Sequence, residues 1–242
     1  MRHDRQVSSP RDTTADRDAA PQFVLPLVVR IERDAPPART AALEAAAHAV
    51  LAFLSDERSV AGEWAERVTA WTDGRIRKVV RRARGAEWRR ASVLDGLTVA
   101  HDGAEVRVFP PVPLDAWPKE LARLQVSGTD LDDPEPPSAP APGVPVLWCN
   151  PELEMTAGKA MAQAGHAAQL GWLALGPDAR NRWAADGFPL AVRTASAADW
   201  PALTAPGSGL PVVRDAGFTE IAPGSCTVVA DLPELRAARG RA

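Results

Sequence analysis

The stretch Glu152-Leu-Glu-Met-Thr-Ala-Gly-Lys-Ala-Met-Ala-Gln-Ala-Gly-His-Ala-Ala-Gln-Leu-Gly171 decides the fold of the second half of the chain. It follows the apolar run 144–149, which predicts a buried strand. Thr156 can cap a helix that begins at the next residue. Polar side chains at i, i+4 and i+7 then project from one face of this helix: Lys159, Gln163 and His166. Another face is apolar and can pack on a sheet.

A second stretch, Arg214-Asp-Ala-Gly-Phe-Thr-Glu-Ile-Ala-Pro-Gly-Ser225, lies between two short strand-like runs, 210–214 and 226–230. Asp215 and Thr219 are polar groups at the exit of a strand, where a rigid backbone commonly presents functional side chains. Gly217 and Gly224 permit backbone geometry that other residues resist. The two stretches together therefore predict one polar site.

These two motifs, Gly-Lys-x-x-x-Gln-x-x-His and Asp-Ala-Gly-x-Thr-x-Ile-x-Pro-Gly-Ser, resemble those of the archaeal/eukaryotic-type peptidyl-tRNA hydrolases (Pth2). The resemblance covers about residues 144–233 and is most specific from Asp215 to Ser225. Two features depart from the family. Ala157 stands where family members often carry a further lysine, and the segment 194–212 is shorter than usual.

The resemblance implies hydrolysis of the ester that joins a peptide to the 3′ ribose of tRNA, with no metal and no cofactor. Its catalytic candidates are Lys159, Asp215, His166, Gln163 and Thr219, and Gly158 and Gly217 would contact substrate. Lys159 can supply positive charge to the developing oxyanion, while Asp215 or His166 can act as the base. The choice between these two stays open at this point.

The composition limits the class of protein. The 242 residues are 45% hydrophobic, which supports a packed core and excludes wholesale disorder. The polar N-terminus lacks the apolar core of a signal peptide, and no apolar run is long enough to span a membrane. Cys149 and Cys226 fit buried reduced thiols, which favours a cytoplasmic location. A homodimer is one arrangement that the sequence allows.

The first half predicts an α+β domain over 21–129, after a disordered tail at 1–20. We expect a strand at 22–31, a helix from 36 to 54, a hairpin around His101-Asp-Gly and a short helix within 114–124. A second helical region from Ser59 is expected to continue, after a break at Asp73-Gly74, to Arg84. Its cations predict a surface that contacts tRNA phosphates: Arg75, Lys78, Arg81 and Arg82.

Residues 130–143 are rich in proline and acid and predict an extended linker between two domains. After it, strands are expected at 144–150, 189–193, 210–214 and 226–230, and helical segments at 157–175, 177–186 and 197–204. A basic tail follows. This alternation predicts an α/β domain over 144–242, and the resemblance implies a small mixed β-sheet with helices on both faces. No internal repeat is visible in the sequence.

Two other functions fit the same residues. The chain could be an RNA-binding protein that keeps the fold and the basic helix but has lost turnover, for which Ala157 leaves room. It could also be a scaffold in which the linker joins two protein-binding modules. An ester-hydrolysis assay separates the enzyme from the RNA-binding protein, and the salt dependence of RNA affinity separates the latter from the scaffold.

Overall fold

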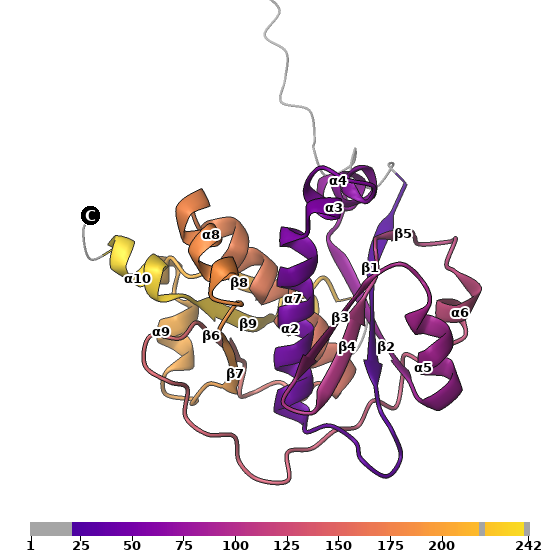
Figure 1. The fold of residues 1–242 in the computed structure, drawn as a ribbon. Helices are drawn as coiled ribbons and strands as arrows, with labels where there is room; N and C mark the ends of the chain where they lie inside the picture. Colours follow the sequence, from indigo (N-terminus) through magenta and orange to yellow (C-terminus); the bar gives the residue numbers. More distant parts are fainter. Residues whose placement is uncertain (1–20, 218–220, 240–242) are drawn as a thin grey trace, which may run out of the picture.

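A computed structural model describes residues 21–217 and 221–239 (Figure 1). The disordered tail expected at 1–20 therefore lies outside the described residues. The elements of the first half are β1 (Phe23–Arg30), α2 (Arg39–Ser55), α3 (Glu57–Val60), α4 (Ala65–Asp73), β2 (Arg77–Ala83), α5 (Gly85–Ser92), β3 (Leu97–His101), β4 (Ala104–Val108), β5 (Val112–Pro113) and α6 (Lys119–Ala122). Those of the second half are β6 (Val146–Cys149), α7 (Ala157–Ala174), α8 (Pro177–Ala185), β7 (Ala191–Thr194), α9 (Trp200–Thr204), the 3-10 turn η1 (Pro206–Ser208), β8 (Val212–Arg214), β9 (Cys226–Asp231) and α10 (Pro233–Arg239).

Each half of the chain builds one mixed sheet. The first has the order β2-β1-β4-β3, with β5 added beside β1, and the second has the order β7-β6-β9-β8. In each sheet one pair of strands is parallel, β1 with β2 and β6 with β7, and the remaining pairs are antiparallel. The expected α/β class, with a small mixed sheet in the second half, is confirmed.

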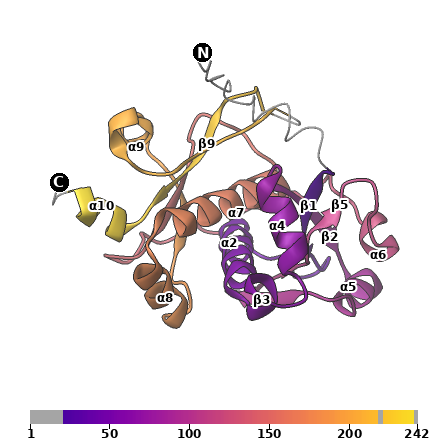
Figure 2. The same cartoon turned by 90° about the horizontal axis from the view of Figure 1, so that it is seen from above.

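Helices α2 and α7 lie side by side in one layer between the two sheets (Figures 1 and 2). The outer face of the first sheet is covered by α5 and α6, where Trp88 and Leu121 join a small apolar cluster. The outer face of the second sheet is covered by α9, where Trp200 packs with Val229. Each sheet is therefore covered on both faces, and the two inner faces share their helices.

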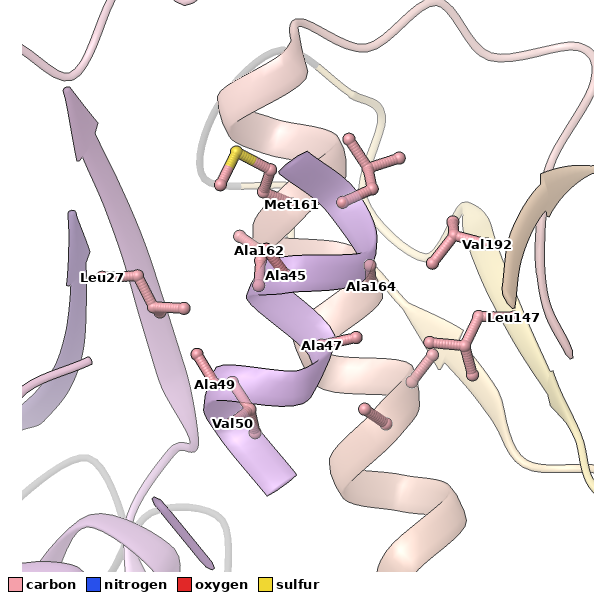
Figure 3. Packing of buried hydrophobic residues seen from close by; sticks show 14 of the residues in the cluster. Leu27, Ala45, Ala47, Ala49, Val50, Leu147, Met161, Ala162, Ala164 and Val192 are labelled. Atoms are coloured by element: carbon pink, nitrogen blue, oxygen red, sulfur yellow. The ribbon is translucent and has the colours of Figure 1, made fainter. Parts of the chain in front are cut away.

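Small side chains allow this close packing. Most buried positions of α2 and many of those of α7 are alanine, as Ala45, Ala47, Ala162 and Ala164 illustrate in Figure 3. A Cβ atom at Gly165 would lie 3.0 Å from Cγ2 of Val50 and 3.4 Å from Cδ of Lys78. The first of these distances is shorter than an ordinary van der Waals contact, so the glycine lets α7 approach the first half of the chain.

One continuous apolar cluster joins the two halves and contains Leu27, Leu51, Leu147 and Met161. The segment 130–143 has neither helix nor strand, yet Leu131 is buried in this cluster and Asp133 accepts hydrogen bonds from the backbone and hydroxyl of Thr40. The division into two domains at this segment stays a prediction. The shared cluster leads us to expect that residues 144–242 alone would be less stable than within the whole chain.

The expected basic helix is wrong, because residues 77–83 form strand β2. The apolar positions Ile76, Val79, Val80 and Ala83 fit a helical stripe, but β2 instead pairs in parallel with the whole of β1. Adjacent β-branched valines favour a strand, and pairing with a central strand decides between the two periods. The exposed helical face on which the phosphate surface was predicted does not exist.

Two smaller differences concern chain ends of elements. The helix expected within 114–124 is only the single turn α6, after a proline-rich entry. Residues 233–239, expected as a basic tail, form helix α10, whose Arg236 binds the carboxylate of Asp231 in β9. The other helices and strands expected after residue 143 are confirmed within a few residues.

We predict that Gly165→Val lowers the free energy of unfolding by about 1–3 kcal/mol, the usual cost of overpacking a core. Urea denaturation measures this. Gly207→Ala is the matched control, because a Cβ there meets nothing within 4 Å, and it should stay within about 0.5 kcal/mol of the parent. In a double-mutant cycle, Val50→Ala should relieve part of the cost by more than about 0.5 kcal/mol. Strict additivity would contradict the contact between Gly165 and Val50.

Candidate functional site

The first turn of α7 presents Lys159. The side chain of Thr156 caps the helix by accepting a hydrogen bond from the backbone N–H of Lys159 at 3.3 Å. The ammonium of Lys159 lies 2.5 Å from Oδ2 of Asp215, which follows strand β8. The two side chains are only 13% and 6% exposed. This is therefore a largely buried ion pair between the helix and the loop after β8.

Gln163, one helical turn further along α7, joins the same pair. Its Nε2 donates to Oδ2 of Asp215 at 2.8 Å, and its Oε1 accepts from the hydroxyl of Thr227 at 2.7 Å. Thr227 is fully buried in β9 and lies within 3.3 Å of the carbonyl of Val213 in β8. Thr227 thus fixes which end of the amide faces Asp215. The sequence analysis missed this residue, although it is a polar residue within an otherwise apolar strand core.

The loop after β8 holds Asp215 in place. The backbone N–H of Gly217 donates to its Oδ1 at 2.8 Å, and the backbone of Asp215 pairs with Ser225 and Gly224. Gly217 has φ of +79°, and a Cβ there would lie 2.3 Å from Cγ of Pro223. Only glycine fits this position. Thr219 lies outside the described residues, so its predicted role stays a prediction.

His166 lies one turn beyond Gln163, on the same side of α7 as a second lysine. Its Nδ1 is 3.1 Å from Nζ of Lys78 in β2. Burial lowers the pKa of His166 well below its ordinary value, and the charges of Lys78 and Lys159 lower it further. The imidazole is therefore neutral at physiological pH.

Lys78 comes from the first half of the chain and is buried. Its Nζ lies 2.5 Å from Oε1 of Gln169 on α7 and 4.8 Å from the ring centre of Trp71. Burial lowers the pKa of Lys78 well below its ordinary value. The sequence analysis expected this cation on an exposed helix in contact with tRNA, and the observed position contradicts that exposure.

The remaining substrate-binding candidates do not gather at Lys159. Arg81 donates to the carbonyls of Ala122 and Leu124 and lies over the ring of Trp117. Arg82 donates to Gln125 and to the carbonyl of Ser127. Arg75 precedes β2 and is half-buried. Gly158, at the start of α7, is buried with room for a Cβ 3.4 Å from Oγ1 of Thr129. Their contacts with RNA stay predictions.

Pockets and metal-ligand geometry do not point to another centre. A cavity of about 440 Å³ lies beside α9, lined by residues that include Trp148, Asp199 and Arg236, and it contains none of the candidate residues. Among residues 21–217 and 221–239, no group of three His, Cys, Asp or Glu side chains is arranged to hold a metal ion. No helix in this part of the chain is long and apolar enough to cross a membrane.

The polar side chains of α7, the loop after β8 and β9 thus converge within one part of the chain. Residues 144–237 match the model of the family described as Peptidyl-tRNA hydrolase PTH2. This confirms the resemblance expected from the two motifs and supports a peptidyl-tRNA hydrolase-like function at the level of the family. The comparison with curated proteins finds no match. The PTH2 match begins after the linker, so it leaves the first half of the chain without a family.

We predict that Thr227→Val, which keeps the shape but removes the hydroxyl, destabilises the protein by about 1–3 kcal/mol, because Gln163 then has an unpaired buried acceptor. Thr227→Ser keeps the donor and should cost less than Thr227→Val. Chemical denaturation of both variants measures the difference. Equal losses would mean that the methyl group, and not the hydrogen bond to Gln163, stabilises this position.

Proposed function

We propose that the chain hydrolyses the ester bond of peptidyl-tRNA and releases peptide and tRNA for recycling. The observation that carries the proposal is the convergence of Lys159, Gln163 and Asp215 within the part of the chain that matches the PTH2 family. Such a role places the protein in the cytoplasm, with peptidyl-tRNA as its partner. A homodimer stays part of this proposal and follows from no contact described above.

Water is the nucleophile in this proposal. Burial raises the pKa of Cys149 to about 12, so this thiol stays protonated and unreactive near neutral pH. Asp215 accepts hydrogen bonds at Oδ2 from Lys159 and Gln163 and at Oδ1 from the backbone of Gly217. Since each carboxylate oxygen has two lone pairs, Oδ1 can still accept a hydrogen bond from the attacking water. Asp215 is then placed to orient the water and take its proton.

Lys159 supplies the positive charge that the reaction needs. Attack on the ester carbonyl creates an oxyanion, and a fixed ammonium in a partly buried site stabilises this charge more than bulk water would. Collapse of the tetrahedral intermediate breaks the bond to the 3′ oxygen of the ribose. The proton taken from water then passes to that oxygen, which completes the hydrolysis without a covalent enzyme intermediate.

We predict that Lys159→Ala and Asp215→Asn each lower the rate of peptidyl-tRNA hydrolysis by about 100-fold or more, as expected for the loss of one preorganised charge. Lys119→Ala is the matched control, because it makes the same change at an exposed lysine of α6. Steady-state assays with purified peptidyl-tRNA give kcat and KM, and circular dichroism checks the fold. Unchanged turnover in the first two variants would refute the site. An inactive parent chain that still binds tRNA would instead favour the RNA-binding function.

Contacts with tRNA phosphates by Arg75 and Arg82 predict salt-dependent binding, with a log–log slope of about −0.7 to −0.9 per phosphate contact. Arg75→Glu and Arg82→Glu should weaken the binding and flatten the slope. Arg82→Gln, which cancels the charge but can still donate to the carbonyl of Ser127, separates the loss of charge from a local disturbance. Slopes that match the parent in all three variants would remove these residues from the RNA surface.

A further inference from the structure

The two sheets are built in the same order from the same sequence of elements. In the first half, β1, α2, β2, α5, β3 and β4 give the order β2-β1-β4-β3, and in the second half β6, α7, β7, α9, β8 and β9 give β7-β6-β9-β8. The strand after the long helix is parallel to the first strand in both halves, and the last strand is antiparallel to it. Helices α5 and α9 both lie on the outer faces (Figure 2).

The strand registers agree as well. Leu27 of β1 pairs with Val80 on one side and Val108 on the other, and all three belong to the shared core. The corresponding residue of β6 is Leu147, whose partners are Val192 and Ala230, again all in the shared core. Matching of side-chain faces strand by strand is stronger evidence of the same fold than strand order alone.

The helices that face each other match residue by residue. His48 is the tenth residue of α2, and His166 is the tenth residue of α7. In the third and seventh places, where α7 carries Lys159 and Gln163, α2 carries Ala41 and Ala45. The β3–β4 connection is the tight turn Asp102-Gly103, whereas the β8–β9 connection is the loop that holds Asp215. The first half therefore has the fold and the histidine but not the polar site.

Contacts between the halves run in both directions across the helix layer. Glu44 of α2 accepts hydrogen bonds from the backbone of Val192 and the guanidinium of Arg193 in β7. In the reverse direction, Lys78 of β2 reaches His166 and Gln169 of α7. Gly165 leaves the space for this, because a Cβ there would lie 3.4 Å from Cδ of Lys78. Of these two cross-contacts, only the second touches the side of α7 that carries Gln163 and Lys159.

We propose that residues 23–108 are a second copy of the fold of residues 146–231 that has lost its own site, and that its Lys78 is a positioning residue for His166. The positioning role rests on the proposed hydrolysis. An ammonium can only donate, so its contact with His166 makes Nδ1 the acceptor. The proton of the neutral ring then lies on Nε2, and His166 offers a donor instead of a basic nitrogen. The open choice between the two candidate bases falls to Asp215.

The charged groups around this imidazole explain why it stays neutral. Among the described residues, Lys78 faces it from β2 and Lys159 from its own helix, and the carboxylate of Asp215 after β8 is held on Lys159. No acid of the described residues is hydrogen-bonded to the imidazole or to Lys78. Adding a proton to His166 would therefore place a third positive charge beside two others.

The direct test is nitrogen NMR of the imidazole rings in the full chain, which has four histidines, assigned with a His166→Gln variant. In the parent, His166 should show a protonated Nε2 and an unprotonated Nδ1 at neutral pH. In Lys78→Met, the pKa of His166 should rise, and the preference for one tautomer should weaken. A protonated Nδ1 in the parent, or the same titration in both proteins, would overturn the proposal whether or not the chain hydrolyses peptidyl-tRNA.

Hydrolysis assays give a second readout that a merely structural role would not move. Lys78→Met should lower kcat by about tenfold, corresponding to one hydrogen bond of about 1.4 kcal/mol, and should move the acid limb of the pH profile to higher pH. Glu44→Gln is the matched control, because it weakens the opposite cross-contact and leaves His166 untouched. Equal losses and unshifted profiles in both variants would reduce Lys78 to a packing residue.

A cut chain tests whether the first half acts as a separate copy. A protease site inserted between Ala141 and Gly143, which are exposed, can be cleaved in the folded protein. The two pieces should stay together as a one-to-one complex and keep the parent signal of His166, because α2 and α7 share their core. Pieces that separate while the larger one keeps the His166 signal would show that the first half supplies nothing to the site.

Discussion

The close approach of α2 and α7 is the constraint on which the rest of the structure depends. Two sheets that share one helix layer leave space for only small side chains where the helices meet, and alanine and Gly165 occupy those places. Because a helix with little apolar bulk gains little from burial on one side, each of these two helices needs both sheets to bury enough surface. The same closeness brings β2 of one half within reach of the α7 side chains of the other.

The site could be predicted from sequence where its geometry is local. Helical spacing alone places Lys159 and Gln163 on one face, and the strand exit places Asp215 opposite them. Thr227 and Lys78 could not be found this way, because each reaches the site from a strand whose position depends on pairing with distant residues. For 76–83 the apolar positions satisfy both a helical and a strand period, and only the partner β1 decides between them.

The repeated fold is invisible in the sequence for a physical reason. A sheet covered by helices requires apolar residues at inward positions and small ones at close contacts, and many different residues meet these demands. Leu27 and Leu147 happen to be identical, but Val108 and Ala230 fill the same place with different volumes. What identifies a copy is therefore the register and strand order, which appear only in three dimensions, together with the histidine at the tenth position of each helix.

The two copies have come to differ in what they can spend on polar groups. A buried charge needs partners, and the second half provides them for Lys159 through Asp215 and for Asp215 through Gln163 and Gly217. The first half has alanine at the helix positions equivalent to Lys159 and Gln163, so its helix is free to serve as packing. Its one buried lysine, Lys78, finds its partners on α7 of the other copy. Because that contact occupies Nδ1 of His166, the free lone pair for a substrate water lies on Asp215, and the two carboxylate oxygens divide the work between holding Lys159 and orienting the water.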